Sequence, residues 1–342
     1  MRGGESMYDK NYLRERVGSM RQLAGIRRAE LEDGKGRGMR ILDVNNGSGL
    51  SFTVYPDRGM DIGEAFFKGI PVAWITPNGP VAPQFYDAGG LNWLRSWGGG
   101  LLTGCGLMNV GGPNASGGEE HGLHGRLSHT PAGQVNARAA WDEEGVYRIE
   151  LNGEIRVSRV FGKNIFMTRK ISTALGENAI IIEDEVENQG FRTTPFMLLY
   201  HMNFGWPLVD ECTTLSMPEH KVIPQNDIAI AGLGEWNRMN EPDPNWIEQV
   251  FYHQLPADED GLARVVMTNP KLNLEVTVEY RVAELPYLVQ WKQLGQGEYV
   301  CGLEPANCFP EGQAAMMKRG TLKKLQPGEI SRSYVKVSFE EL

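Results

Sequence analysis

The stretch VNARAAWDEEGVYRIELNGEIRVSRVFGKNIFMTRKISTALGENAIIIEDEVENQG, residues 135–190, decides the fold. Apolar and polar residues alternate along it, and the alternation is interrupted by turn-forming residues at 144–145, 162–164, 176–178 and 188–190. A period of two places successive side chains on opposite faces of a β-strand, whereas a helix requires a period of 3.6. The stretch therefore predicts at least four consecutive antiparallel strands, as in a β-sandwich.

The same pattern continues on both sides of this stretch. Residues 38–55 read as a hairpin around the Asn-Asn-Gly-Ser-Gly turn at 45–49, and residues 61–77 as another around 68–69. Further strands are expected over 194–207, 264–283, 286–305 and 330–339. Strands and helices do not alternate along the chain, so a parallel α/β fold is not expected.

Two segments differ from this pattern. Leu13, Val17, Met20 and Leu23 recur at helical spacing and predict a short helix within residues 7–30. We interpret residues 1–30 as an appendage packed on one sandwich domain of residues 31–342. The Gly- and Trp-rich segment 89–122 sustains neither period, and we interpret it as an ordered loop that covers one side of a cleft.

Composition narrows the classes of partner. The 342-residue chain is 41% hydrophobic and carries a net charge of −9 without a basic run, which argues against nucleic acid and anionic membranes as partners. The N-terminal stretch lacks the apolar core of a signal peptide, and no stretch is apolar enough to span a membrane. We therefore expect a cytoplasmic protein. The expected free thiols are those of Cys105, Cys212, Cys301 and Cys308.

Few residues suit acid–base chemistry. Three of the six histidines, His121, His124 and His129, lie within residues 119–132. His201 ends the apolar run at 194–207, and Glu304 ends the alternating segment YVCGLE at 299–304. Burial raises the pKa of a carboxyl group, which suits a general base near neutral pH. An ordinary hydrogen-bonded histidine and a solvent-facing glutamate are the alternatives at each position.

Arginine and tryptophan supply candidate sugar contacts. Arg58 follows a strand in YPDRGMDI, residues 55–62, where its donors suit sugar hydroxyls, although an ordinary turn with a local ion pair is equally compatible. If the sugar were phosphorylated, Arg58, Arg95 and Arg126 could receive the phosphate. Tryptophan faces suit the C–H faces of a sugar ring, but tryptophan is also common in protein cores.

Four motifs, taken in order, resemble those of the aldose 1-epimerase (galactose mutarotase-like) superfamily, and within it the DUF4432 family. The resemblance covers roughly residues 36–340. The motifs are Tyr55-Pro56-Asp57-Arg58-Gly59, His124-Gly125-Arg126, Tyr200-His201-Met202-Asn203-Phe204-Gly205-Trp206 and Gly302-Leu303-Glu304-Pro305. The resemblance implies a mostly all-β protein, an antiparallel β-supersandwich with a short N-terminal helix.

The same resemblance implies a function and roles for residues. An aldose 1-epimerase interconverts the anomers of a sugar by opening and closing its ring, without a metal or organic cofactor. Glu304 would be the general base, His201 the general acid, and His124 would assist. The expected sugar-binding residues are Arg58, Arg126, Asn203, Trp206, Trp97 and Trp291. Asp210 is a candidate for the family's substrate-binding aspartate.

Two other functions remain compatible with the sequence. His121, His124, His129, His201 and Glu304 could hold a divalent metal for sugar isomerisation, epimerisation or elimination, although their spacing matches neither HxH nor HExxH. The same fold could also serve a non-catalytic carbohydrate-binding protein. A small sugar is the expected partner in each case, and the sequence leaves room for a homodimer.

Overall fold

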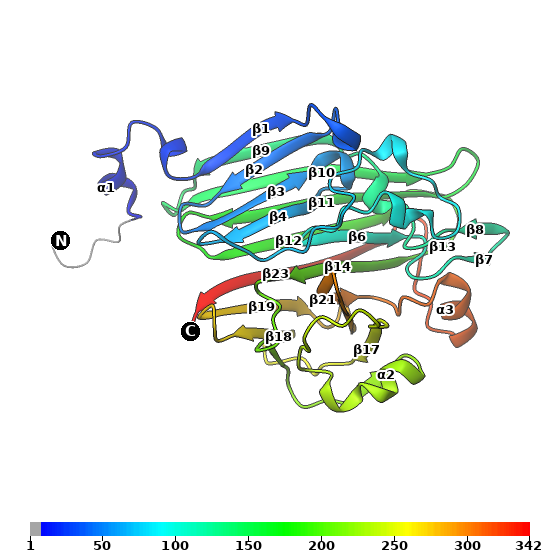
Figure 1. The fold of residues 1–342 in the computed structure, drawn as a ribbon. Helices are drawn as coiled ribbons and strands as arrows, with labels where there is room; N and C mark the ends of the chain where they lie inside the picture. The colour runs from blue at the N-terminus through cyan, green and yellow to red at the C-terminus, as the bar shows by residue number, and fades with distance from the viewer. Residues whose placement is uncertain (1–7) are drawn as a thin grey trace.

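Two antiparallel β-sheets packed face to face form the body of the protein (Figure 1). The computed structural model describes residues 8–342. In sheet order, the 11 strands of the larger sheet are β1 (Gly25–Glu30), β2 (Arg40–Asn45), β3 (Leu50–Tyr55), β4 (Asp61–Phe67), β6 (Leu102–Leu107), β14 (Met197–Gly205), β21 (Glu298–Ala306), β20 (Tyr287–Gly295), β17 (Gln249–His253) and β16 (Val222–Pro224), with β5 (Ile70–Pro71) beside β4. This arrangement confirms the predicted antiparallel sandwich.

The smaller sheet has eight strands and contains the stretch that predicted the fold. In sheet order they are β15 (Thr214–Ser216), β18 (Leu262–Asn269), β19 (Leu274–Arg281), β23 (Ile330–Glu341), β12 (Ala179–Asn188), β11 (Asn164–Ala174), β10 (Tyr147–Ser158) and β9 (Gly133–Trp141). Two further strand pairs are β13 (Thr194–Pro195) with β22 (Lys324–Leu325) and β7 (Asn114–Ser116) with β8 (Glu119–His121).

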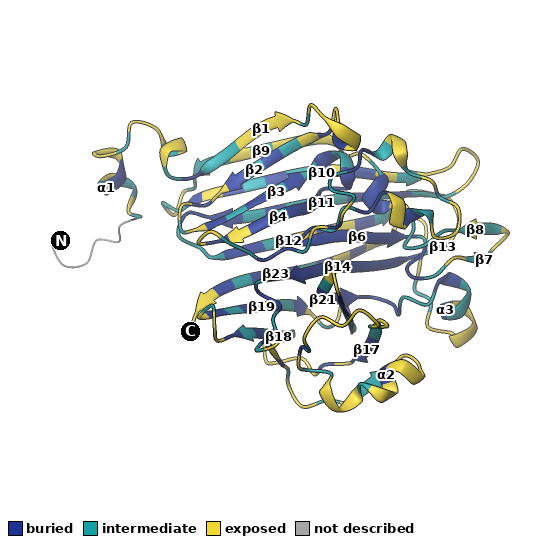
Figure 2. Ribbon diagram, in the orientation of Figure 1, coloured by how far each residue is buried: buried dark blue, intermediate teal, exposed yellow. Residues whose placement is uncertain are grey.

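Helices are short and lie outside the sheets. The α-helices are α1 (Lys10–Arg14), α2 (Asp227–Ala231) and α3 (Gln313–Arg319). The 3₁₀ turns are Met20–Gln22, Gly34–Gly36, Pro56–Arg58, Pro83–Phe85, Asn92–Arg95, Leu127–His129 and Leu233–Glu235. Buried residues concentrate on the strands, while α2 and the outer loops are largely exposed (Figure 2). In the described chain, 8–342, no helix has the length and apolar character needed to cross a bilayer.

The N-terminal segment contains the expected short helix and also a strand. Asp9 caps α1 through its side chain, and Leu13 packs into the main core. The helical spacing does not continue as one helix to Leu23, because Ser19 caps a separate 3₁₀ turn. Strand β1 follows and pairs with β2 from Gly25↔Asn45 to Glu30↔Arg40. The last residues of segment 1–30 are thus the edge of the larger sheet.

The glycine-rich segment 89–122 contains a central strand that the sequence pattern did not predict. Strand β6, LTGCGL, is buried on both faces and therefore shows no alternation. At Gly104 a Cβ atom would lie 3.0 Å from Cδ2 of Leu127 and 3.3 Å from Nη1 of Arg169. Glycine there lets the neighbouring elements pack closely against the strand. All four cysteines of the chain are free thiols, as expected.

A buried polar network joins the two sheets. Arg169 of β11 donates to Asp184 of β12 through Nε at 2.9 Å and Nη2 at 2.7 Å. From the larger sheet, Tyr200 of β14 donates its hydroxyl to Asp184 Oδ2 at 2.5 Å, while Arg169 Nη1 donates to the Gly59 carbonyl at 3.1 Å. These side chains are almost fully buried. Each buried charge therefore depends on its partners.

We expect Asp184→Ala to lower the free energy of unfolding by about 3–5 kcal/mol, because the buried Arg169 guanidinium loses the carboxylate that it bonds directly and keeps only that of Asp61 at 3.9 Å. Glu185→Ala is the matched control, since Glu185 is the next residue on β12 and forms an exposed ion pair with Arg332 of β23. That change should alter stability by less than about 1 kcal/mol. Equilibrium unfolding in urea measures the unfolding free energy of each variant. Equal losses would show that the network does not stabilise the sandwich.

Candidate active site

The central strands of the larger sheet place His201 beside Glu304. Strands β14 and β21 pair with Leu199 opposite Ala306 and Met202 opposite Leu303, which sets His201 opposite Glu304. His201 Nε2 lies 3.3 Å from Glu304 Oε1, and the two side chains are 7% and 3% exposed. The register thus brings together an imidazole and a carboxyl group that are far apart in the sequence.

The pair lies in a cavity of about 400 Å³. The cavity is lined by Leu91, Trp93, Leu94, Trp97, Gly111, Gly112, Leu123, His124, His201, Gln225, Glu248, Val250, Val289, Trp291, Glu304 and Pro310. Five of the expected site residues, His124, His201, Glu304, Trp97 and Trp291, are in this set. Segment 89–122 supplies several of the lining residues, as expected for a loop that covers one side of the cleft. A cavity of this size suits a small ligand.

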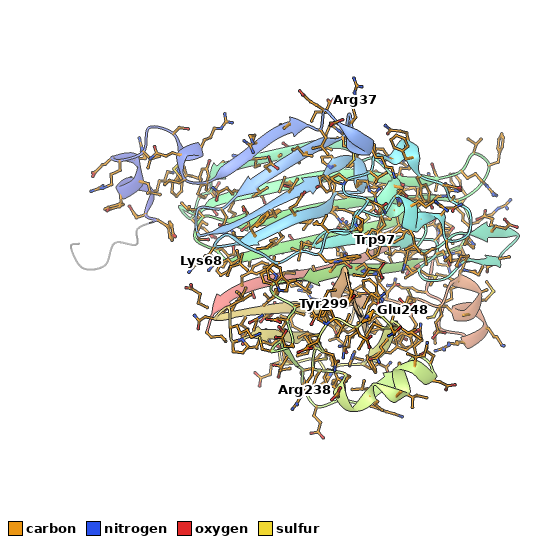
Figure 3. The ribbon with its side chains drawn as sticks, viewed as in Figure 1. Arg37, Lys68, Trp97, Arg238, Glu248 and Tyr299 are labelled. Carbon is orange, nitrogen blue, oxygen red and sulfur yellow. The ribbon has the colours of Figure 1, made fainter. Side chains whose placement is uncertain are left out.

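Tryptophans surround the acid–base pair. The His201 ring centroid lies 5.2 Å from that of Trp97 and 5.3 Å from that of Trp291. Trp97 Nε1 donates to Thr103 Oγ1 at 2.9 Å, and Thr103 is the β6 residue opposite His201. Trp97 lies above Glu248 in the view of Figure 3, and both residues line the cavity. The walls therefore offer aromatic faces to a ring-shaped ligand.

His124 approaches the pair from the segment that follows β8. Its ring centroid lies 5.6 Å from that of His201. Its backbone has a φ of +54° and is held by two hydrogen bonds, from its N–H to the Gly111 carbonyl and from Gly106 N–H to its own carbonyl. His124 Nδ1 accepts from Gly111 N–H at 3.4 Å, which favours the tautomer with its proton on Nε2.

Burial sets the protonation of the site. It lowers the pKa of His201 to about 3, with a further contribution from His124, and lowers the pKa of His124 to about 4. Burial, and secondarily the Glu248 carboxylate, raise the pKa of Glu304 well above its usual value. At neutral pH both imidazoles are therefore uncharged, and burial shifts Glu304 towards its protonated form.

Gly302 makes room for the Glu304 carboxyl group. It lies two residues before Glu304 on β21 and opposite Asn203 on β14. A Cβ atom at this position would lie 2.6 Å from Glu304 Oε1 and 3.2 Å from the Cβ of Trp291. The absence of a side chain at 302 therefore fixes where the carboxyl group can lie.

Arg58 does not reach the cavity. It is 4% exposed and donates to the carbonyls of Val81 and Ser96 at 2.9 and 2.8 Å and to Ser128 Oγ at 2.8 Å. All three bonds are made to loop segments beside the site, including the one that carries Trp97. The guanidinium therefore ties these loops to the sandwich.

Four other candidates also lie outside the cavity. Asn203 is buried and donates to the carbonyls of Gly100 and His201 at 2.9 and 3.0 Å. Trp206 is 68% exposed. Arg126 lines a separate cavity of about 360 Å³, and Asp210 pairs with Lys271 on the surface at 3.0 Å.

The remaining histidines of segment 119–132 do not join His124. His121 lines the same separate cavity as Arg126. His129 stacks on Tyr86 with ring centroids 4.0 Å apart, and its Nε2 lies 2.9 Å from Ser96 Oγ. Between residues 8 and 342, no three His, Cys, Asp or Glu side chains are grouped so that they could hold a metal ion.

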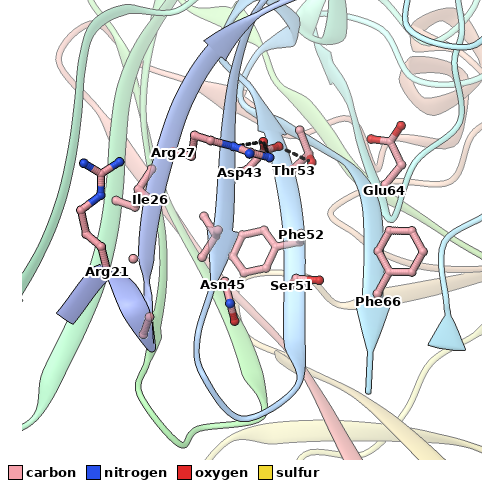
Figure 4. Close-up of a pocket in the computed structure, with 13 residues that line it drawn as sticks. Arg21, Ile26, Arg27, Asp43, Asn45, Ser51, Phe52, Thr53, Glu64 and Phe66 are labelled. Carbon is pink, nitrogen blue, oxygen red and sulfur yellow. Dashed lines mark hydrogen bonds and ion pairs between the residues drawn. The ribbon is translucent and has the colours of Figure 1, made fainter. Parts of the chain in front are cut away.

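A larger groove lies elsewhere, on the outer face of β1–β4 (Figure 4), with a volume of about 500 Å³. Its polar side chains pair with each other: Arg27 bonds Asp43 at 3.0 Å, and Thr53 donates to the same carboxylate at 2.9 Å. None of the candidate catalytic residues lines it. Size alone therefore does not identify the site.

Sequence reasoning missed the wall formed by Gln225, Glu248, Val250 and Val289. Trp291 Nε1 donates to Glu248 Oε2 at 2.8 Å, which holds this carboxylate beside the cavity. The only sequence signal was the period of two in β17 and β20, which places Val250 on one face of the sheet with Trp291 opposite it. The sequence did not reveal which face was the cavity face.

A sandwich of two antiparallel sheets with an acid–base pair on its larger sheet defines a protein of the galactose mutarotase-like class. A proposed aldose 1-epimerase from Klebsiella pneumoniae has a similar structure, with a TM-score of 0.86 and 26% identity over 92% of this chain and 83% of that one. Galactose 1-epimerase from Lactobacillus acidophilus has a TM-score of 0.62 and 16% identity, with 93% and 99% coverage. The second likeness shows the fold alone.

The chain belongs to the DUF4432 family, described as a domain of unknown function, which matches residues 36–339. Another structure of the same class, a proposed aldose 1-epimerase from Escherichia coli K12, has a TM-score of 0.58 and 16% identity, covering 89% of this chain and 100% of that one. No curated protein matches the chain. The resemblance inferred from the four sequence motifs is thus confirmed at the level of family and fold.

We expect the buried neutral state of His124 to weaken the fold in acid. Its pKa is about 4 in the folded protein and 6.5 as an ordinary histidine, so below pH 6.5 the unfolded chain binds a proton that the folded chain does not. The contribution of His124 to the free energy of unfolding is therefore complete above pH 6.5. It falls by about 2 kcal/mol between pH 7 and pH 5. In His124→Asn, the change in unfolding free energy between these pH values should differ from wild type by that amount. An unchanged pH dependence in urea unfolding would contradict the assignment.

Proposed function

We propose that the protein interconverts the anomers of an aldose by general acid–base catalysis. The observation that carries the proposal is the contact between His201 and Glu304 at 3.3 Å inside an aromatic-walled cavity. Structural similarity to aldose 1-epimerases of the same fold supports the reaction class. The buried position of Glu304 favours a catalytic protein over a purely carbohydrate-binding one, because burying a carboxyl group is costly unless it is used or paired.

The two groups of the pair match the two proton transfers of the reaction. One group must accept the proton of the anomeric hydroxyl, and another must donate a proton to the ring oxygen as the C1–O5 bond breaks. The resulting open-chain aldehyde rotates about its C1–C2 bond and closes on the other face. An imidazole and a carboxyl group 3.3 Å apart can supply both functions. By family resemblance Glu304 is the base and His201 the acid, and His124 lies close enough to assist at a hydroxyl.

Several wider expectations belong to the same proposal. A small sugar is the partner, and the protein works in the cytoplasm. Among the expected sugar contacts, Trp97 and Trp291 line the cavity and can stack on the ring. Arg58 and Asn203 act indirectly, because their hydrogen bonds hold the backbone around the cavity. The absence of nucleic acid as a partner and the homodimer remain predictions from the sequence.

Glu304→Gln and His201→Asn should each slow anomer exchange by about 10²–10⁴-fold, because each removes one proton-transfer group. Exchange is measured by NMR saturation transfer on a panel of aldoses, with and without a chelator. Glu298→Gln is the matched control, since Glu298 lies on the same strand and is exposed. Wild-type exchange no faster than in buffer alone would overturn the proposal. Loss of activity with chelator would favour a metal-assisted reaction instead.

We also expect neither histidine of the cavity to gain a proton between pH 8 and pH 6. Burial lowers the pKa of His201 to about 3 and that of His124 to about 4, so both imidazoles stay uncharged across this interval. The test is the NMR chemical shift of each imidazole C–H across this range, assigned by comparison with His201→Asn and His124→Asn. A titration midpoint between pH 6 and 7 would instead indicate imidazoles with an ordinary pKa.

A further inference from the structure

The cavity around the acid–base pair has a one-sided charge distribution. Among the described residues that line it there is no lysine or arginine, and its two acidic side chains are Glu248 and Glu304. The imidazoles of His124 and His201 are neutral at pH 7, because burial lowers the pKa of each. Every ionisable group in the lining is therefore neutral or negative at neutral pH.

The arginines closest in sequence to the cavity segments do not offset this charge. Arg58 is buried and fully occupied by two carbonyls and a hydroxyl. Arg126 belongs to the neighbouring cavity, and Arg95 bonds Asn92 through Nε at 3.2 Å. The three arginines that could have formed a phosphate site do not converge. A sugar phosphate or a uronic acid would thus enter the cavity without a cationic partner.

The uncharged part of the cavity also favours a cation. Trp93, Trp97 and Trp291 present their rings to it, and an aromatic face attracts an ammonium group through its quadrupole. The Glu248 carboxylate is held at the cavity by the Trp291 indole, which bonds one of its two oxygens at 2.8 Å. Its other oxygen has no hydrogen-bond donor within residues 8–342 and can accept from a ligand.

We propose that the physiological substrate is an amino sugar with a protonated amino group, and that Glu248 is the residue that selects it. The proposal rests on the proposed function, because it names the substrate class of that same site. The ammonium group would lie between the Glu248 carboxylate and the tryptophan faces. Acidic sugars are excluded by like charge, and neutral sugars bind without the added ion pair.

An ammonium group in the cavity would also act on the catalytic pair. A positive charge near a buried carboxyl group favours its ionised form. Binding an amino sugar would therefore lower the pKa of Glu304 and make its carboxylate more available as a base than it is in the empty site.

Binding without turnover tests the proposal. Glucosamine, galactosamine and mannosamine are compared with glucose, with N-acetylglucosamine and with glucuronate, by titration calorimetry on wild type and on Glu304→Gln. At least one amino sugar should bind about fivefold to tenfold more tightly than glucose, as expected for a charged hydrogen bond at a partly exposed site. The N-acetyl derivative of that amino sugar has no charge and should not show this increase in affinity over glucose. Glucuronate should bind more weakly than glucose.

The Glu248→Gln variant removes the charge of this side chain and keeps its size. It should abolish the advantage of the amino sugar over glucose, compared as the ratio of the two binding constants within each variant. Glu298→Gln, at an exposed position on β21, should leave this ratio as in wild type. Equal binding of glucosamine-type sugars and glucose by wild type, an amino-sugar advantage that survives Glu248→Gln, or no binding of any amino sugar would each overturn the proposal.

Anomer exchange measured on the same sugars distinguishes this proposal from the proposed function. Amino-sugar binding that depends on Glu248 without accelerated exchange would overturn catalysis and leave the charge selection standing. Accelerated exchange of neutral or acidic sugars with no preference for amino sugars would leave catalysis standing and overturn the charge selection.

Discussion

The buried network of Arg169, Asp184 and Tyr200 links the two sheets in the arrangement on which the site depends. Tyr200 of the larger sheet bonds Asp184, and the same strand presents His201 on its opposite face because side chains alternate along a strand. The network on the core side thus fixes the strand whose other side carries the His201 imidazole. In a low-dielectric core such a network is stabilising only when every member is paired, so it tolerates a single geometry.

A second buried guanidinium extends this order to the cavity wall. Arg58 bonds loop carbonyls on the site side of the larger sheet, and one of these, Ser96, directly precedes Trp97. Asn203 bonds the Gly100 carbonyl in the same glycine-rich segment. Segment 89–122 is therefore ordered by polar side chains that reach it from the sheet. The wall tryptophans owe their positions to these contacts as well as to apolar packing.

The site combines burial with a negative charge balance. Burial keeps both imidazoles of the cavity uncharged at neutral pH and raises the pKa of Glu304. In the proposals above, His201 and Glu304 carry the reaction, while Glu248 and the tryptophans select the sugar. Reaction type and substrate choice would then depend on different residues of the same cavity. This division is consistent with a fold that hosts several related activities.

The sequence by itself determined the strands, the sandwich and the two reactive groups, because alternation, turn residues and strand-end polar groups are local features. It could not show β6, whose two faces are both buried, or the neighbours of each candidate. Only the tertiary structure decided that His201 lies opposite Glu304, that Arg58 bonds loop carbonyls outside the cavity, and that Glu248 joins the cavity. The physical reason is that strand register and sheet order are set by packing between residues far apart in the chain, which no local pattern specifies.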